Sequence, residues 1–549
     1  MGFSQVFRHF TVSDPSLNLG TPAEEGRSVA KAAGLLGVLT FASRILGLAR
    51  DVGQAAILGT GMAADAFTIA FIIPNILRRL FGEATVASAL VPTYTETLLK
   101  EGKAEAGKLA GKILTFVGAA LLVVVLLGML LAPILVDLFA AGFQNEPGKT
   151  QLTVQLLRLL FPYILFVGIA SVCMGILNSH RHFLAPALAP ILFNVSALIG
   201  LFVLAGMWRA DMPVWAYSIG VLTGGALQLA VQIPFMKSRG IKLRPDFYWK
   251  DERFRRVLKL AVPALVGLMA AEVNILVDQL IASLLAEGSV AALSYGLRVT
   301  QVPQGIFAVA LATALLPTLS RQTALGKLDE AGRTLGLSTL VISGIMLPAA
   351  LYLIVMAEPV VRVMFFRGEF TDASLRLTAA SLRYYSVGMV FYAAVKITAP
   401  VFYALKDTKT PVKIAIGCMG LNIVLNGILT YIFLKTGIAE PLAGLALASS
   451  IASVVNLAML KHKLKGKVGK AGVPMKSWTA LAFSGAGTLL LLLYLRPIVE
   501  GFSSAGLLQG AVSIALSSLS VMTLSMGLFF ITGGDQVRVT IRKIIRRGR

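Results

Sequence analysis

The chain is poor in charged residues. Only 14% of its 549 residues are Asp, Glu, Lys or Arg, whereas 56% are hydrophobic, and soluble proteins average about 25% charged residues. The mean hydropathy is +0.79. This composition excludes an ordinary soluble globular protein and predicts a chain that crosses a membrane several times.

Cysteine and histidine are also scarce, and no common catalytic motif is present. The two cysteines, Cys173 and Cys418, lie in apolar runs and indicate neither a disulfide framework nor a metal site. No H-E-x-x-H, G-x-S-x-G or Walker A motif occurs, so we expect no enzyme. The first thirty residues lack the apolar core of a cleaved signal peptide. Residues 1–32 are therefore expected to form a poorly ordered extension.

Long apolar runs dominate the rest of the chain. A run of about 20 residues spans the hydrocarbon core of a membrane as a helix, because lipid offers no partner for open backbone polar groups. The sequence predicts an all-α polytopic membrane protein with 14 transmembrane helices, near residues 33–58, 66–92, 112–140, 153–178, 185–206, 214–236, 257–285, 290–316, 335–357, 380–405, 411–434, 441–460, 475–495 and 507–532.

The net charge of +23 raises the question of a nucleic-acid partner, but the distribution of charge argues against one. Alternate connections between the runs, together with both ends of the chain, hold 35 Lys and Arg residues, and the opposite connections hold seven. Basic residues of membrane proteins collect in cytoplasmic loops. We therefore expect both termini in the cytoplasm and no nucleic-acid partner.

The chain matches itself weakly at one constant offset in residue number, which we call the repeat offset. The matches are LVPT at 90–93 with LLPT at 315–318, AEAGK at 104–108 with DEAGR at 329–333, Arg158 with Arg383, and Pro186 with Pro411. Six predicted spans separate the copies, and an even number preserves orientation. The sequence thus predicts a parallel pseudo-two-fold repeat of two six-helix lobes plus two extra C-terminal helices, an architecture typical of alternating-access transporters.

The expected organisation has seven parts. They are a cytoplasmic extension (1–32), an N-lobe (33–236), a basic linker (237–256), a C-lobe (257–460), a basic loop (461–474), two further helices (475–532) and a basic tail (533–549).

Charged residues inside the predicted spans gather in the N-lobe. The stretch SRILGLARD at 43–51 brings Arg44, Arg50 and Asp51 into the first span; the second holds Asp65, Asn75, Arg78, Arg79 and Glu83; and the C-lobe holds Asp278, Arg298 and Lys396. An arginine at membrane depth costs a few kcal/mol, and guanidinium groups bind phosphate in a bidentate geometry. Three arginines in one cavity therefore favour a substrate with a phosphate or diphosphate.

Internal pairing is the alternative explanation for these arginines. Asp51, Asp65 and Glu83 are available as partners. For Arg79 and Glu83, which are four residues apart, an ion pair is the favoured interpretation. Asp65 could instead cap the second helix.

Two stretches make the chain resemble a known family. SRILGLARD, followed by GTGMAADAFTIAFIIPNILRRLFGEATVASALVP, resembles the signature of the MurJ (MviN) lipid II flippases, which belong to the multidrug/oligosaccharidyl-lipid/polysaccharide exporter superfamily, and KDTKTPVKIAI at 406–416 is similar to another family stretch. The resemblance runs from about residue 33 to the C-terminus.

The resemblance implies a specific transport function. The family moves lipid II, the undecaprenyl-diphosphate-linked peptidoglycan precursor, from the cytoplasmic to the periplasmic leaflet of the bacterial inner membrane. A cationic cavity holds the diphosphate, and a groove at the last two spans guides the lipid tail. We expect a monomer without a cofactor, with cell-wall synthesis proteins as candidate partners.

Matched to the family, the important positions fall on the same cluster of residues. The resemblance implies substrate binding by Ser43, Arg44, Arg50, Asn75, Arg78 and Arg298, and gating or charge pairing by Asp51, Asp65 and Glu83, to which the four-residue spacing adds Arg79 as the partner of Glu83. One departure stands beside Arg298. Leu297 and Gln301 occupy positions where some relatives carry acids, which puts a salt-bridge gate at Arg298 in doubt.

Some family members also bind sodium in the C-lobe. Asp278, with Asn422 and Asn426 one helical turn apart, offers oxygen ligands to a hard cation. A hydrogen-bond network between helices explains the same residues. Coupling to protons or to membrane potential remains equally open.

Three other functions compete with this interpretation. A flippase for another undecaprenyl-linked oligosaccharide or a cation-coupled drug exporter belongs to the same superfamily, although a drug exporter should carry acids and aromatics in its cavity. A membrane enzyme acting on polyprenyl phosphates needs clustered acids or a nucleophile, which we do not find. A scaffold gives no reason for a cationic cavity.

Overall fold

The computed structural model describes residues 22–80, 90–207, 213–241, 246–248, 250–469 and 472–532, with the backbone alone for 22–33, 35 and 260–271. Within these ranges the chain is helical and contains no strand, only an isolated bridge between Lys465 and Val468. The predicted all-α class is confirmed for this part of the chain. Two compact units are present: residues up to Leu58 together with Met62–Glu272, and Gly59–Gly61 together with Val273 onward.

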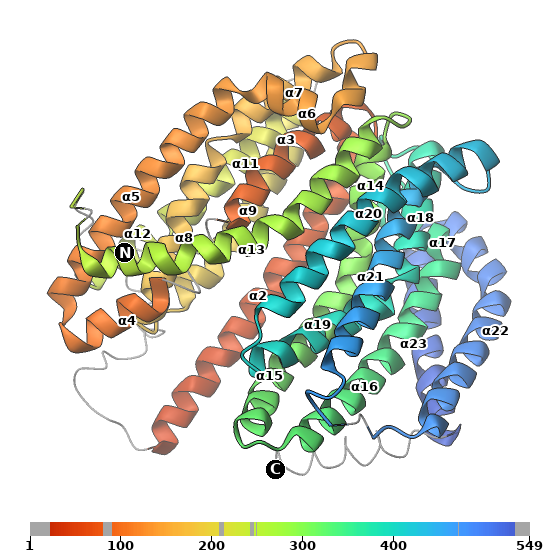
Figure 1. Cartoon of the computed structure of the whole chain (residues 1–549). Helices are drawn as coiled ribbons and strands as arrows, with labels where there is room; N and C mark the ends of the chain where they lie inside the picture. Colours follow the sequence, from red (N-terminus) through yellow and green to blue (C-terminus); the bar gives the residue numbers. More distant parts are fainter. Residues whose placement is uncertain are drawn as a thin grey trace. The chain divides into compact units, whose positions relative to one another are not determined.

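The first unit is a bundle in which α9 packs against α11 and against α2, while α3 packs against α7 (Figure 1). Its elements are α2 (Pro22–Leu58), α3 (Met62–Arg79), α4 (Val91–Lys100), α5 (Lys103–Leu130), α6 (Ala132–Phe139), the 3-10 turn η4 (Ala141–Asn145), α7 (Lys149–Leu160), α8 (Tyr163–Ser179), α9 (Leu184–Ile199), the π-turn η5 (Gly200–Leu204), α10 (Ala205–Met207), α11 (Pro213–Ala230), α12 (Ile233–Ser238) and the first part of α13 (Glu252–Ser283).

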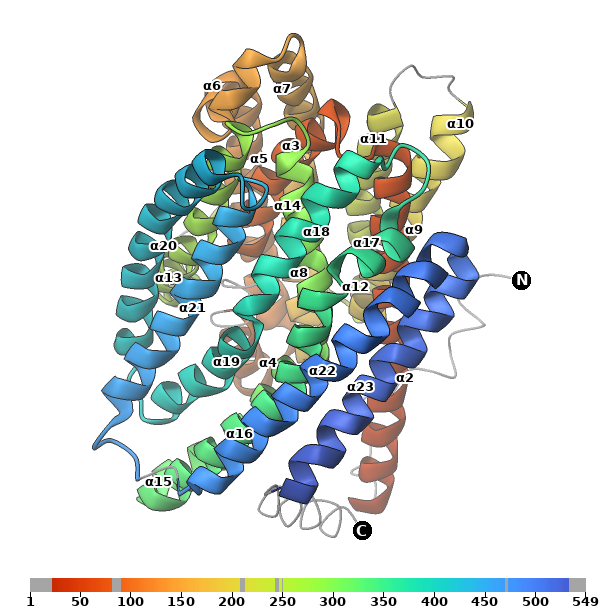
Figure 2. The same ribbon diagram turned by 90° about the vertical axis from the view of Figure 1, so that its right-hand side faces the viewer.

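The second unit begins inside α13. Its further elements are α14 (Ser289–Pro303), the π-turn η6 (Gln304–Ala308), α15 (Val309–Ala324), α16 (Leu328–Val355), α17 (Ala357–Phe365), α18 (Asp372–Val387), α19 (Met389–Ala404), α20 (Lys409–Thr436), α21 (Ala443–Leu464), α22 (Met475–Ala505) and α23 (Leu507–Thr532). Figure 2 shows α22 and α23 side by side, and both contact α16. Serine hydroxyls join the two helices, since Ser484 Oγ donates to the Ser525 carbonyl oxygen at 2.7 Å.

Local sequence explains where several helices begin and end. Thr371 and Ser374 form a reciprocal capping box at the start of α18. Gly148 and Gly288 precede α7 and α14 with φ of 81° and 87°, a left-handed conformation that glycine adopts without steric cost. Gly437, with φ of 64°, ends α20 in the same way.

Helix bounds in the two units match at the repeat offset that the sequence shows. Helix α5 covers Lys103–Leu130 and α16 covers Leu328–Val355. The first and last residues of α16 therefore follow those of α5 at the repeat offset, the same offset that separates Arg158 from Arg383. Arg181 and Lys406, which have positive φ of 56° and 61° without being glycine, are separated by the same offset. An unusual backbone conformation is therefore found at matching positions of the two units.

One side-chain hydrogen bond is repeated as well. Arg158 Nε donates to the Met129 carbonyl oxygen at 3.1 Å, and Arg383 Nε donates to the Ile354 carbonyl oxygen at 3.3 Å. In each case the acceptor lies near the C-terminus of a long helix, where carbonyl groups lack intrahelical partners. Donor and acceptor are both displaced by the repeat offset between the units.

Helices able to cross a membrane are numerous. In the described residues, ten are long and apolar enough, and eleven if α18 and α19, bent by 48°, form one span. The chain is therefore a multi-pass membrane protein. Helices α2, α3 and α13 also overlap predicted spans. Helix α3 carries Asp65, Arg78 and Arg79 within 18 residues, and parts of α2 and α13 lie outside the residues whose side chains the structure describes.

Candidate functional site

Arg50 lies at the centre of a polar cluster between α2 and α9 of the first unit. Its Nη2 and Nε donate to Asp51 Oδ1 at 2.8 and 3.2 Å, and its Nη1 donates to Asn194 Oδ1 at 3.1 Å. Asn194 Nδ2 in turn donates to the Ser43 carbonyl oxygen at 3.1 Å. These bonds use three of the five guanidinium N–H donors, so Arg50 is held in place and retains donors for an anion.

Aromatic rings border this cluster. The Arg50 guanidinium carbon lies 5.4 Å from the centre of the Phe193 ring, within the range of a cation–π interaction. Phe193 packs on Tyr163, and Tyr163 on Phe71, at centroid distances of 5.9 and 5.5 Å. The rings lower the local polarity around Arg50, which strengthens its attraction for an anionic group.

A cavity of about 330 Å³ lies beside the cluster in the first unit. Ser43 and Arg44 line it from α2, and Asn178 and Phe183 line it together with α9 residues. Arg44 is exposed. The structure thus places two of the predicted binding residues on one hollow.

The second predicted span holds two arginines with different partners. Arg78 Nε donates to Asn75 Oδ1 at 2.9 Å, one turn earlier on α3. Arg79 Nη2 lies 3.0 Å from Glu272 Oε2 of α13. The predicted partner of Arg79, Glu83, lies outside the described residues, and the ion pair seen for Arg79 is with Glu272.

Asp65 forms a buried ion pair near the start of α3. Its Oδ2 lies 2.9 Å from Lys149 Nζ, and the two side chains are 2% and 1% exposed. Lys149 also contacts Glu146 Oε1 at 2.9 Å and the Phe143 ring at 4.4 Å. The recorded ion-pair partner of Asp65 is therefore a lysine, whereas the sequence had suggested an arginine.

In the second unit, Arg298 lies half-buried on α14. Leu297 and Gln301, the neighbours that replace acids of some relatives, lie on the same helix. Neither Leu297 nor Gln301 therefore offers a carboxylate to Arg298.

The three predicted cation ligands of the second unit lie together. Asn426 Nδ2 donates to Asp278 Oδ1 at 2.6 Å. Asn422 is best satisfied when its amide oxygen accepts from Ser449 N at 3.0 Å and its nitrogen donates to Asn274 Oδ1 at 2.9 Å. Asn426 Oδ1 is buried and has no hydrogen-bond partner among the described residues. The Asp278 carboxylate and the Asn426 amide oxygen thus lie together in a buried position, whereas the Asn422 amide oxygen faces Ser449.

The family can now be decided. The family model described as lipid II flippase MurJ matches residues 54–508, which is well over half of the chain. This chain belongs to the lipid II flippase MurJ family. The resemblance found in the sequence is therefore confirmed, and at the family level the protein is a transporter and not a catalyst of a chemical reaction.

Relatives and solved structures agree with this assignment. A probable lipid II flippase MurJ of Vibrio cholerae serotype O1 is 32% identical over 489 residues, covering 87% of this chain and 91% of the relative. The structure of lipid II flippase MurJ in an inward closed conformation is 26% identical with a TM-score of 0.73, covering 92% of this chain and 99% of that chain. An inward-facing MATE transporter of the MOP superfamily, 13% identical with a TM-score of 0.63 over 77% of this chain and 95% of that chain, shares the fold.

Sequence reasoning missed Asn194, Lys149 and Glu272. Asn194 was identifiable as a single amide inside the apolar stretch ILFNVSALIG. Lys149 was counted as an ordinary loop lysine. It is buried beside Asp65 only because α3 packs against α7. No sequence signal pairs Glu272 with Arg79.

Proposed function

We propose that this chain is a flippase that moves lipid II from the cytoplasmic to the periplasmic leaflet of a bacterial inner membrane. The observation that carries the proposal is the match to the lipid II flippase MurJ family over residues 54–508. The polytopic helical fold supports it. A single chain holding both units supports a monomer, with cell-wall synthesis proteins as candidate partners.

The substrate diphosphate is bound by arginines. Arg50 and Arg78 of the first unit and Arg298 of the second supply the guanidinium groups, with Ser43, Arg44 and Asn75 as further contacts. Support comes from Arg50, which is fixed by Asp51 and Asn194 and retains further donors. A prepositioned guanidinium loses little side-chain entropy when it binds a diphosphate. Asp51, Arg79 and Glu83 act as charge partners that change during transport, whereas Asp65, buried against Lys149, is a charge partner that stays in place.

The topology we propose has 14 spans and cytoplasmic termini. Helices α2, α3 and α13 complete the set, and the charged residues on α2 and α3 are those that bind or gate. The 35 to seven distribution of basic residues supports the orientation. The matches at the repeat offset support two repeated six-helix lobes, and α22 and α23 are the addition.

The undecaprenyl tail is guided by α22 and α23. Large apolar side chains are exposed on both helices, including Leu490, Tyr494, Leu508 and Leu516. Such a surface suits a long hydrocarbon chain in the bilayer.

A sodium ion fits the cluster around Asp278. Hard cations prefer oxygen ligands, and the cluster offers the Asp278 carboxylate with the Asn426 amide oxygen, while the Asn422 amide would rotate to present its oxygen to the ion. The unpartnered Asn426 Oδ1 supports this fit, because a buried oxygen without a donor is costly unless a cation pairs with it. A sodium gradient would supply the driving force for transport. If transport continues after sodium is removed, protons or the membrane potential supply the driving force instead.

Lipid II binding to the purified protein tests the proposal. The wild type is compared with Arg78→Ala and with Arg376→Ala, an exposed arginine on α18 as matched control, with an undecaprenyl-linked oligosaccharide lacking the peptide as competitor. We expect preferential binding of lipid II that Arg78→Ala weakens at least tenfold and Arg376→Ala leaves unchanged. Equal binding of both lipids would reassign the substrate to another undecaprenyl-linked oligosaccharide, and binding of neither would refute the proposal.

A further inference from the structure

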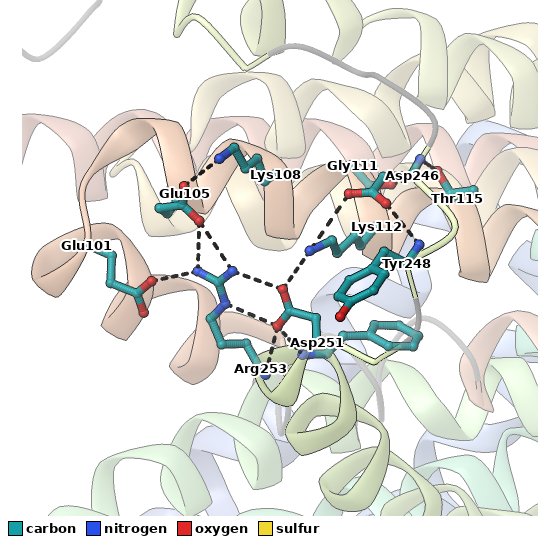
Figure 3. Close-up of polar contacts among 11 residues, drawn as sticks. Glu101, Glu105, Lys108, Gly111, Lys112, Thr115, Asp246, Tyr248, Asp251 and Arg253 are labelled. Atoms are coloured by element: carbon teal, nitrogen blue, oxygen red, sulfur yellow. Dashed lines mark hydrogen bonds and ion pairs between the residues drawn. The ribbon is translucent and has the colours of Figure 1, made fainter.

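A buried ion pair joins α5 to the segment that leads into α13. Lys112 Nζ lies 2.6 Å from Asp251 Oδ2, and the two residues are 6% and 8% exposed. Figure 3 shows the pair at the centre of a larger network, with Asp251 pointing at both Lys112 and Arg253. Separating two buried charges is strongly unfavourable.

Arg253 extends the network to the start of α5 and the turn before it. Its Nη1 donates to Glu101 Oε2 at 2.6 Å, and its Nη2 donates to Asp251 Oδ2 at 2.9 Å. Both guanidinium nitrogens also contact Glu105 Oε2 at 3.3 Å (Figure 3). The guanidinium thus connects three carboxylates, two of which lie far from it in the sequence.

Asp251 also caps α13. Its Oδ1 accepts from the backbone N–H groups of Arg253 and Phe254 at 2.9 and 3.4 Å, which are among the unpaired donors of the first turn. Hydrogen bonds from Arg253 and Lys112 hold the pKa of the Asp251 carboxyl well below its usual range. These contacts therefore favour the charged form of the carboxylate.

Apolar packing reinforces these contacts. Phe254 and Val257 are 4% and 2% exposed and belong to one buried cluster with Leu109 of α5. The Phe254 ring stacks on Phe116 at a centroid distance of 4.6 Å. Releasing this segment would expose apolar surface and unpaired charges together.

A second described contact of α13 with the first unit lies farther along the helix. Arg79 and Glu272, near the point where α13 passes into the second unit, form an ion pair at 3.0 Å. Helix α13 is therefore tied to the first unit through charged residues at two places along its length.

We propose that residues 246–248 and 250–257, held by Lys112, Asp251, Arg253 and Phe254, form a permanent anchor that makes the start of α13 a rigid part of the first unit. This anchor stays closed in every state of the transport cycle, and the movement that transport requires takes place C-terminal to Val257. The reference to a transport cycle rests on the proposed function. The anchor itself rests only on contacts within the first unit.

Hydrogen exchange of the full-length protein tests the anchor without a substrate. Lys112→Met leaves Asp251 without its lysine, whereas Lys108→Met on the same helix removes an exposed lysine that pairs with Glu105 at 2.7 Å. We expect amides of Arg253–Val257 to exchange at least about tenfold faster in Lys112→Met and at the wild-type rate in Lys108→Met. Equal exchange in the two variants would overturn the anchor.

A reversible cross-link distinguishes a permanent anchor from a latch that opens. Asp246 N donates to Thr115 Oγ1 at 3.0 Å, so Thr115→Cys with Asp246→Cys, in a Cys173→Ala, Cys418→Ala background, places two thiols close together. We expect the bridged protein to move lipid II at the rate of its reduced form. Transport that stops on bridging and returns on reduction would overturn the proposal. If the reduced protein moves no lipid II, the proposed function fails, and hydrogen exchange still decides the anchor.

Discussion

The two units place different chemistry on matching helices. In the first unit α2 meets α9 through Arg50 and Asn194, and in the second α13 meets α20 through Asp278 and Asn426. At the repeat offset, Asp278 and Asn426 correspond to Gly53 and Leu201. A Cβ added to Gly53 would lie 2.9 Å from the Phe202 ring, so the first unit has no room for a carboxylate there.

The difference shows that the two units repeat the arrangement of helices but not the side chains that would bind a ligand. Arg50 corresponds to Ile275, and Lys149 corresponds to Ser374. At Arg50 the first unit therefore presents a cation suited to an anionic substrate, and at Asp278 the second unit presents oxygen atoms suited to a small cation.

The largest expected effect concerns Lys149 and its counterpart. Lys149→Met leaves the buried Asp65 carboxylate without its lysine, which should lower the free energy of unfolding by about 3–5 kcal/mol. Ser374, at the matching position, shares a hydroxyl hydrogen bond of 2.8 Å with Thr60, and Ser374→Ala should cost only about 1 kcal/mol. Chemical denaturation in detergent measures both.

A double variant supplies the control for the lysine. Asp65→Leu with Lys149→Met removes both charges and should recover most of the lost stability, because an apolar pair tolerates burial. A double variant as unstable as Lys149→Met alone would contradict the ion-pair explanation.

The next effect concerns the Arg50 guanidinium of the first unit. Arg50→Ala should weaken lipid II binding about a hundredfold, equivalent to about 2.7 kcal/mol. Arg50→Lys keeps the charge but cannot bridge Asp51 and Asn194, so its affinity should be intermediate. Binding that is unaffected in both variants would remove Arg50 from the site. Arg376→Ala is the matched surface control.

A smaller effect is expected from the oxygen cluster of the second unit. Sodium at ten times its dissociation constant should stabilise the wild type by about 1.4 kcal/mol relative to choline. Asp278→Asn should abolish this shift, and Asp51→Asn in the first unit should preserve it. Thermal unfolding in the two salts measures the difference, and a shift that persists in Asp278→Asn would place the ion elsewhere.

The smallest expected change in stability tests whether the two units share one arrangement of helices. Arg158→Ala and Arg383→Ala each remove one hydrogen bond to a helix carbonyl, and each should cost about 1 kcal/mol. Because the two bonds are equivalent, the two losses should agree within about 0.5 kcal/mol. Clearly unequal losses in denaturation midpoints would weaken the equivalence of the units.

Helices and the repeat were predictable from the sequence because they depend on local composition. Apolar runs mark spans, and the ends of α5 and α16 follow the repeat offset that short sequence matches reveal. Asn422 and Asn426 were also predictable, since their four-residue spacing on one helix places them on one face.

Partners between distant helices were not predictable. Glu83, which four-residue spacing favours as the partner of Arg79, lies outside the described residues, and no spacing rule offered Glu272, with which Arg79 forms an ion pair in the structure. Lys149 has the sequence surroundings of a surface lysine, and only the packing of α3 against α7 buries it against Asp65. Tertiary packing decides which charged residues meet, and the local pattern of one sequence does not reveal that packing.

The most direct measurement is lipid II translocation by the purified protein in sealed vesicles, with the wild type, Arg50→Ala and Arg376→Ala compared at equal protein content. Labelled lipid II that reaches the opposite leaflet is detected by a membrane-impermeant enzyme. The account predicts transport by the wild type and Arg376→Ala and its loss in Arg50→Ala. Vesicles in which the wild type moves no lipid II, or in which Arg50→Ala equals the wild type, would contradict it.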